Sequence, residues 1–197
     1  MTTISNKQRS IATGILIIAA YSMLTYSATG NVPLGVITDI ISGLAVIGIP
    51  LLLFPYFNTD RIKKLNFTYL VSRIIEGLLM VMGGLFILNP ALEGYRNFLY
   101  LHFHIYFFIA GALFFYVLLY QTQIIPSFIS IWGILATVLL LIVSIIKLFG
   151  VDLPILNVFL APIITNELFL AVWFMVKGLS KKNSVRKHLI SNISANP

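Results

Sequence analysis

The sequence contains no cysteine, which excludes disulfide bonds, thiolate-bound metals and cysteine nucleophiles. Charge is also scarce: Asp, Glu, Lys and Arg make up 10% of the residues, whereas soluble domains carry about 25%. Such a chain cannot cover a water-facing surface of this size with charged side chains. Hydrophobic residues make up 59% of the sequence, so we expect lipid to be the solvent for much of the protein.

Acidic residues are the scarcer of the two charged kinds, and the net charge is +7. In a soluble protein this excess would suggest a nucleic-acid partner. Here the basic residues lie at the ends of hydrophobic runs and in the C-terminal tail, so we expect topology signals and contacts with anionic lipid, and no nucleic acid. The sequence has no glycine-rich phosphate loop, His-Glu-x-x-His pair or Gly-x-Ser-x-Gly elbow, and it predicts no cofactor.

Six hydrophobic runs are each long enough to cross about 30 Å of hydrocarbon. The breaks between them are short and contain the glycine, proline and polar residues typical of tight hairpins. The sequence therefore predicts an all-α fold, a polytopic bundle of about six transmembrane helices. It forms a single domain over residues 1–178, followed by a basic, flexible tail over 179–197. The runs cover residues 11–28, 34–57, 67–88, 98–120, 126–149 and 154–175.

Basic residues accumulate in the segments that six spans would place on the terminal side of the membrane. The opposite side holds only Arg96 and, near a helix end, Lys147. The positive-inside rule then predicts that both termini are cytoplasmic and that the protein is a multi-pass protein of the cell (inner) membrane. The residues on the terminal side are Lys7, Arg9, Arg61, Lys63, Lys64, Lys177, Lys181, Lys182, Arg186 and Lys187.

The first run has an alternative interpretation as a cleaved signal peptide, because Lys7 and Arg9 precede it. Tyr26 is bulky where a cleavage site needs a small residue, which argues against cleavage. The charge bias does not decide the question, since the other five spans would keep their orientation.

A few ionisable residues lie inside the runs, where a charge facing lipid is costly, so we expect them to face the bundle interior. Arg73 and Glu76 are three residues apart on one helix face and can pair. Glu76 lies roughly 18 Å along its helix from Lys64, and Glu167 lies roughly 15 Å from Lys177, so both carboxyls have a similar depth. We predict an intramembrane pocket that binds a small or lipid-like ligand, or relays protons or ions. Its residues are Arg73, Glu76, Asn166 and Glu167.

Two carboxylates and one guanidinium leave an excess negative charge in this predicted pocket. Either one carboxyl is protonated at neutral pH, or a cation or a cationic ligand group balances it. Two other functions stay open. The network can simply fix helix register in an accessory membrane subunit, or the two carboxyls can act as acid and base in an intramembrane enzyme. The sequence favours binding over catalysis.

A second polar group is predicted toward the outer side, made of Asp39, His102 and His104. The two histidines are two residues apart, so on an α-helix they point about 200° apart and cannot share a metal ion. Each aligns instead with a tyrosine four residues away. We expect Asp39 to pair with one of the histidines or to complement the dipole of its own helix.

Several short segments resemble one protein family. They are the segment Ser72–Gly77, the hairpin over 119–126, and the ending Asn166-Glu167-Leu168 with Trp173 and Lys177-Gly178. Together they are similar to a bacterial membrane-protein family, the domain of unknown function numbered 4386. The resemblance spans most of the chain from the first helix to Gly178. It implies a multi-helix protein of the bacterial inner membrane, adds emphasis to Arg73, Glu76 and Glu167, and implies no particular activity.

Overall fold

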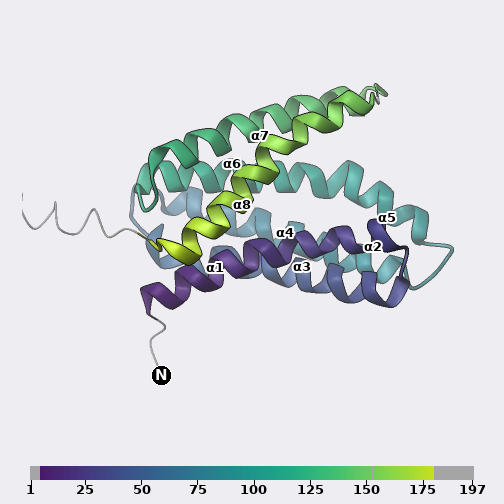
Figure 1. Cartoon of the computed structure of the whole chain (residues 1–197), viewed down its shortest axis with the longest axis horizontal. Helices are drawn as coiled ribbons and strands as arrows, with labels where there is room; N and C mark the ends of the chain where they lie inside the picture. The colour runs from purple at the N-terminus through teal and green to yellow at the C-terminus, as the bar shows by residue number, and fades with distance from the viewer. Residues whose placement is uncertain (1–4, 152, 180–197) are drawn as a thin grey trace, which may run out of the picture.

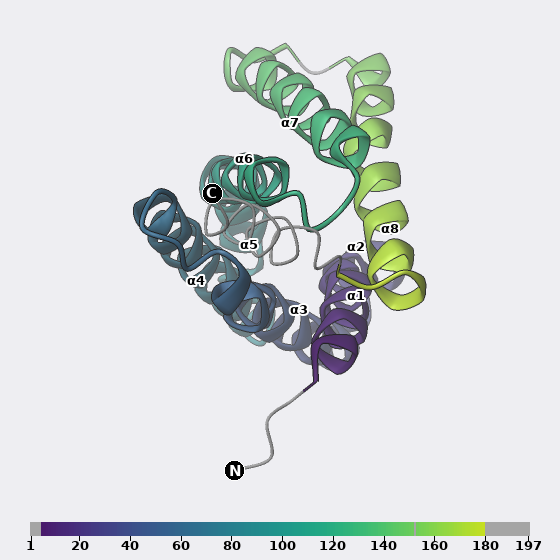
Figure 2. The same cartoon turned by 90° about the vertical axis from the view of Figure 1, so that its left-hand side faces the viewer.

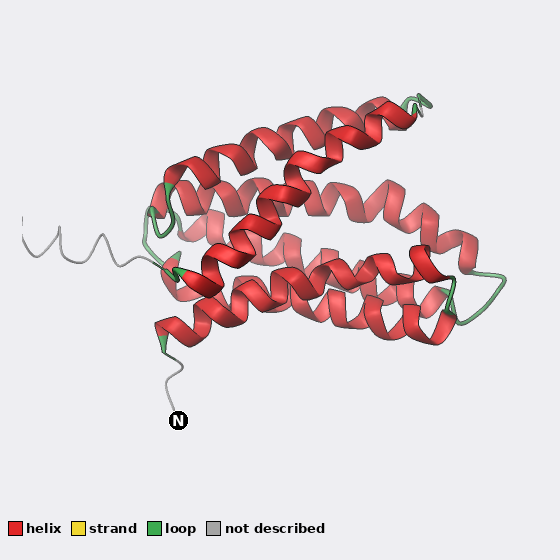
Figure 3. Ribbon diagram, viewed as in Figure 1, coloured by secondary structure: helices red, strands yellow, loops and turns green. Residues whose placement is uncertain are grey.

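The computed structural model describes residues 5–151 and 153–179, and this part of the chain contains helices and no strand. Figure 3 shows the helices and their short connections. The elements, in chain order, are α1 (Asn6–Ala20), η1 (Tyr21–Met23), α2 (Leu24–Thr29), α3 (Val32–Leu53), η2 (Phe54–Tyr56), α4 (Lys63–Phe86), α5 (Glu93–Leu99), the π-helix η3 (Tyr100–His104), α6 (Ile105–Thr122), α7 (Ser127–Leu148), η4 (Pro154–Leu160) and α8 (Ala161–Val176).

These elements join into six spans that are long and apolar enough to cross a membrane, so the protein is a multi-pass membrane protein. The predicted all-α fold with six spans is confirmed. The spans are Asn6–Thr29, Val32–Tyr56, Lys63–Phe86, Glu93–Thr122, Ser127–Leu148 and Pro154–Val176.

The difference from the predicted boundaries that matters for the site lies at the start of the fourth span. The sequence predicts a loop through residue 97, but helix α5 already begins at Glu93. Glu93 places a negative charge in the first helical turn, where it complements the helix dipole. Arg96 lowers the hydrophobicity of this segment, yet its side chain is buried in an ion pair, so the polar residues belong to the span.

The six spans form a closed ring. Contacts connect α1 to α3, α3 to α4, α4 to α6, α6 to α7, α7 to α8, and α8 back to α1. Figure 2 shows this order when the bundle is viewed along its length. Figure 1 shows that the start of α1 and the end of α8 lie at one end, here called the terminal end, while the connections α2–α3, α4–α5 and α7–α8 lie at the opposite, distal end.

Helices α3 and α4 approach closely because two glycines face each other. A Cβ atom built on Gly43 would lie 2.5 Å from the carbonyl oxygen of Gly77, and one on Gly77 would lie 2.5 Å from that of Gly43. Backbone atoms cannot rotate away as a side chain can, so any Cβ atom here must push the two helices apart. Small residues commonly have this role between membrane helices.

We expect Gly77→Ala to destabilise the protein by about 1–3 kcal/mol, the usual cost of overpacking. The measurement is the unfolding free energy of the purified protein in mixed micelles. Gly94→Ala is the control, because nothing lies within 4 Å of a Cβ atom at that exposed helical position. Alanine should leave stability there unchanged or slightly higher. Equal stability of the two variants would contradict the close approach.

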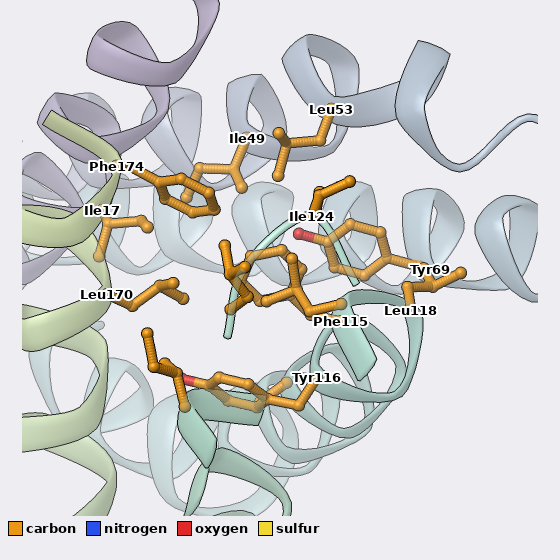
Figure 4. Close-up of a cluster of buried hydrophobic side chains, with 14 of the residues drawn as sticks. Ile17, Ile49, Leu53, Tyr69, Phe115, Tyr116, Leu118, Ile124, Leu170 and Phe174 are labelled. Atoms are coloured by element: carbon orange, nitrogen blue, oxygen red, sulfur yellow. The ribbon is translucent and has the colours of Figure 1, made fainter. Parts of the chain in front are cut away.

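Large apolar side chains fill the interior of the ring toward the terminal end. Figure 4 shows Leu53, Tyr69 and Leu118 from three different spans gathered with Phe115 and Phe174. The rings of Tyr69 and Phe115 stack with centroids 5.3 Å apart and planes 8° apart. This end of the interior is closed, so the open space in the bundle lies further along, toward the distal end.

Candidate functional site

A cavity of about 410 Å³ lies inside the ring, and all six spans contribute to its wall. Most lining side chains are aliphatic or aromatic. On α3 and α7, for example, the wall is made only by Val46, Ile49 and Leu140. The polar or ionisable lining residues are Tyr21, Arg73, Glu76, Tyr100, His104 and Glu167.

The cavity is bordered by side chains that also form the outer surface of the bundle. Leu24, Leu101 and Ile164 line it from α2, η3 and α8, and their exposed fractions are 53%, 64% and 37%. In a membrane protein, exposed apolar side chains at span depth contact acyl chains. The cavity therefore meets the lipid-facing surface in the distal half of the bundle.

The course of α8 explains why the ring is wider in this half. Near the terminal end α8 packs tightly on α1, where a Cβ atom on Gly14 would lie 2.6 Å from the carbonyl oxygen of Ala171. At the distal end the segment before α8 lies beside α7, where Lys147 Nζ donates to Asn157 Oδ1 at 2.8 Å. Figure 1 shows α8 crossing obliquely between these two neighbours. The crossing separates α8 from α2.

Arg73 and Glu76 form a buried ion pair on α4, as their spacing predicts. Arg73 Nη1 donates to Glu76 Oε2 at 2.7 Å and to Oε1 at 3.0 Å, and Glu76 is only 1% exposed. The guanidinium carbon lies 5.6 Å from the ring centroid of Phe108. Gly111 makes room for this arrangement, since a Cβ atom there would lie 2.9 Å from Arg73 Nε. Arg73 Nε itself is buried and has no hydrogen-bond partner among the described residues.

His104 lies beside the Arg73–Glu76 pair and not in the predicted outer group. Its side chain is buried, and Nε2 lies 3.9 Å from Glu76 Oε1, too far for a hydrogen bond, so Nε2 has no partner within residues 5–151 and 153–179. Because the fourth span begins at Glu93, His104 lies deeper than the predicted boundary implies. Its ring packs on Tyr100 at 4.9 Å, which confirms the predicted alignment of these two residues.

The segment that carries Tyr100 and His104 is a π-helix. The N–H of Ile105 donates to the carbonyl of Tyr100, five residues earlier, instead of four. Single π turns of this kind inside α-helices are frequent at functional sites. The sequence predicts an ordinary α-helix here, and no motif in it signals the wider turn.

Glu167 lines the cavity from α8 and is bound by a residue that sequence reasoning missed. Its Oε2 accepts a hydrogen bond of 2.7 Å from the hydroxyl of Tyr21, which begins η1 where the first span leaves α-helical geometry. Glu167 is only partly buried, whereas Glu76 is almost fully enclosed. Of the two carboxyls, Glu167 is therefore the accessible one.

Asn166 does not line the cavity, although the sequence predicts that it shares a pocket with Glu167. Its Nδ2 donates to the backbone carbonyl of Ile129 on α7 at 3.1 Å. Consecutive helical residues point about 100° apart, so Asn166 faces α7 when Glu167 faces the cavity. The structure thus brings Arg73, Glu76 and Glu167 to one cavity and places Asn166 in a helix contact.

Asp39 pairs with Arg96, not with a histidine as expected. The carboxylate of Asp39 is fully buried, and it accepts hydrogen bonds from Arg96 Nε at 2.9 Å and from Nη2 at 3.2 Å. The guanidinium carbon lies 4.9 Å from the ring of Tyr26 and 4.6 Å from that of Tyr100. The expectation is wrong because Arg96 belongs to the fourth span and not to a loop. His102 is exposed and packs on Phe98.

The cavity therefore combines an apolar wall with a polar inner face of defined chemistry. Its groups are a paired guanidinium with a free N–H, an unpartnered imidazole nitrogen, and a carboxyl bound to a tyrosine hydroxyl. Among the described residues, no three His, Asp or Glu side chains come together as metal ligands would. The arrangement can hold a molecule that is largely apolar and carries one polar or charged group.

Comparison of the chain with the curated proteins found no match, and neither did comparison with the solved structures. Residues 15–178, which include all the cavity-lining residues, match a protein family described as a domain of unknown function (DUF4386). The match covers well over half of the chain, and the protein belongs to this family.

Proposed function

We propose that this protein binds a small, lipid-like ligand within the membrane, with the apolar part of the ligand along the cavity wall and its polar group at Arg73, His104 and Glu167. The observation that carries the proposal is the border of the cavity at lipid-exposed Leu24 and Leu101. A ligand dissolved in the bilayer has a route from acyl chains to buried polar groups without crossing water.

Two unpaired nitrogen atoms favour binding over a purely structural network. Buried polar atoms in native proteins are almost always hydrogen-bonded, and each exception needs a reason. Arg73 Nε and His104 Nε2 are both exceptions, and both residues line the same cavity. The volume of about 410 Å³ also falls in the range of ligand pockets, about 300–1,000 Å³.

The enzymatic alternative has less support. Acid–base catalysis needs a carboxyl free to exchange a proton with a substrate. Glu76 is held by two contacts to Arg73 and is almost fully enclosed. Among the described residues that line the cavity, Glu167 therefore has no second free carboxyl that could act with it as acid or base.

We also propose that both termini are cytoplasmic and that the membrane is a bacterial inner membrane. Basic residues at the terminal end support this orientation. The cavity then opens toward the outer leaflet. The transmembrane domain extends over residues 1–178, and the tail over 179–197 contacts anionic lipid; beyond residue 179 the tail lies outside the described residues. The described basic residues at the terminal end are Lys7, Arg9, Arg61, Lys63, Lys64 and Lys177.

Native mass spectrometry of the detergent-purified protein tests ligand binding. We expect the wild type to retain a bound molecule and the cavity-filling variant Ala20→Phe to lose it, because Ala20 lines the cavity. The control is Ala28→Phe, on the exposed surface of α2 and outside the cavity. A wild type with no bound mass, or equal retention by the two variants, would contradict the proposal.

A further inference from the structure

We infer that the ligand of this cavity is a hydrophobic cation, whose charged group the carboxylate of Glu167 binds; this inference rests on the proposed function.

Within the part of the chain that the structure describes, the charges that face the cavity leave one carboxyl without a counterion. Arg73 and Glu76 neutralise each other through contacts of 2.7 and 3.0 Å. Glu167 is held by the hydroxyl of Tyr21, which donates a hydrogen bond but carries no charge. The cavity walls from α3 and α7 contribute no ionisable group. The titratable groups that line the cavity are Tyr21 on η1, Arg73 and Glu76 on α4, Tyr100 and His104 on η3, and Glu167 on α8.

Position also favours Glu167 as the group that meets the ligand. Glu76 is covered by its partner Arg73, whereas Glu167 is partly exposed. Aromatic side chains lie in the same wall, among them Phe108 and Phe115. Ring faces attract cations and repel anions, which adds to the selectivity for positive charge. The apolar remainder of the wall selects a cation that is itself hydrophobic.

The empty cavity requires a proton on Glu167. An ionised carboxylate in an apolar enclosure is costly when no cation accompanies it. Glu167 therefore holds a proton in the absence of ligand, and the arriving cation replaces it. One positive charge enters the cavity and one proton leaves, so the net charge of the cavity is the same before and after binding. Binding should strengthen as pH rises.

Tetraphenylphosphonium is a suitable probe, and tetraphenylborate is its anionic counterpart of nearly the same shape. Titration calorimetry with the full-length protein, in buffers of different ionisation heat, measures affinity and proton release together. We expect the phosphonium to bind with release of about one proton and the borate to bind at least about tenfold more weakly. Glu167→Gln should weaken phosphonium binding about tenfold or more and abolish proton release, because a charge-assisted contact is lost.

The chain offers a matched control for this variant. Glu93 also accepts a hydrogen bond from a tyrosine, Tyr26, but the pair is exposed and outside the cavity. Glu93→Gln should bind the phosphonium as the wild type does. The wild type alone gives a second measurement, since infrared difference spectra should show loss of a protonated-carboxyl band when the phosphonium binds.

Equal affinity for the phosphonium and the borate, unchanged binding by Glu167→Gln, or no loss of the carboxyl band would each overturn the inference. These results are separable from failure of the proposed function. A neutral or anionic molecule that co-purifies with the wild type and is lost from Ala20→Phe would keep the cavity as a ligand site and refute only its preference for cations.

Discussion

Asp39→Leu is expected to destabilise the protein by about 3–5 kcal/mol, because it leaves the buried guanidinium of Arg96 without its counterion. Asp39 is fully buried and Arg96 is 4% exposed, so water cannot replace the lost carboxylate. The remaining contacts of Arg96 are Met23 O at 3.3 Å and two tyrosine rings, none of which carries a negative charge. The measurement is the free energy of unfolding by SDS in mixed micelles.

The double variant Asp39→Leu with Arg96→Met separates loss of the ion pair from damage to packing. Replacing both members of a buried pair by apolar residues of similar volume is often close to neutral. We therefore expect the double variant to recover most of the stability lost in Asp39→Leu. A single variant within about 1 kcal/mol of the wild type would show that Arg96 finds other solvation, as polar groups in membrane proteins sometimes do.

Glu76→Leu is expected to have an effect of similar size, about 3–5 kcal/mol, through Arg73. A guanidinium cannot lose its proton in a protein, so Arg73 would stay charged in an apolar wall. The variant should also lose the ligand in native mass spectrometry, since the unpaired positive charge of Arg73 in the cavity would repel a cation. Unfolding by SDS and ligand retention are measured on the same preparation.

Arg73→Met provides the comparison. It leaves Glu76 buried without its partner, but a carboxyl can take up a proton and become neutral. We expect Arg73→Met to be less destabilising than Glu76→Leu at pH 7. If Arg73→Met were the more destabilising variant, the carboxylate of Glu76, and not the guanidinium of Arg73, would be the group that needs its partner in the ion pair.

The spans and part of the site could be predicted because they depend on local or one-dimensional properties. A bilayer requires long apolar segments with internal hydrogen bonding, so hydropathy alone finds the six spans. The Arg73–Glu76 pair follows from a spacing of three on one helix. The shared depth of Glu76 and Glu167 follows from counting residues along two helices, and both line the same cavity.

The parts that could not be predicted depend on contacts between distant segments. Tyr21 and Glu167 are 146 residues apart, and an ordinary tyrosine in the first span gives no sign of its partner. Hydropathy places Arg96 in a loop, because a charge lowers the hydropathy of its segment whether or not an acid on another helix neutralises that charge. With Arg96 in a loop, His104 comes too close to the surface and Asp39 lacks its true partner.

The π turn in the fourth span has a consequence for the rotational phase of that helix. Four α-helical residues rotate by 400°, so side chains four apart drift by about 40° at each step. The wider turn over Tyr100–His104 rotates less per residue and reverses the drift. Arg96 and His104 can therefore point in nearly the same direction, one to Asp39 and the other to Glu76. Deleting one residue here would restore a regular α-helix in which about seven steps separate Arg96 from the histidine; these rotate by about 700°, within about 20° of two full turns, so both acids would keep their neighbours, whereas the same deletion in an unbroken α-helix would turn its two halves by about 100°.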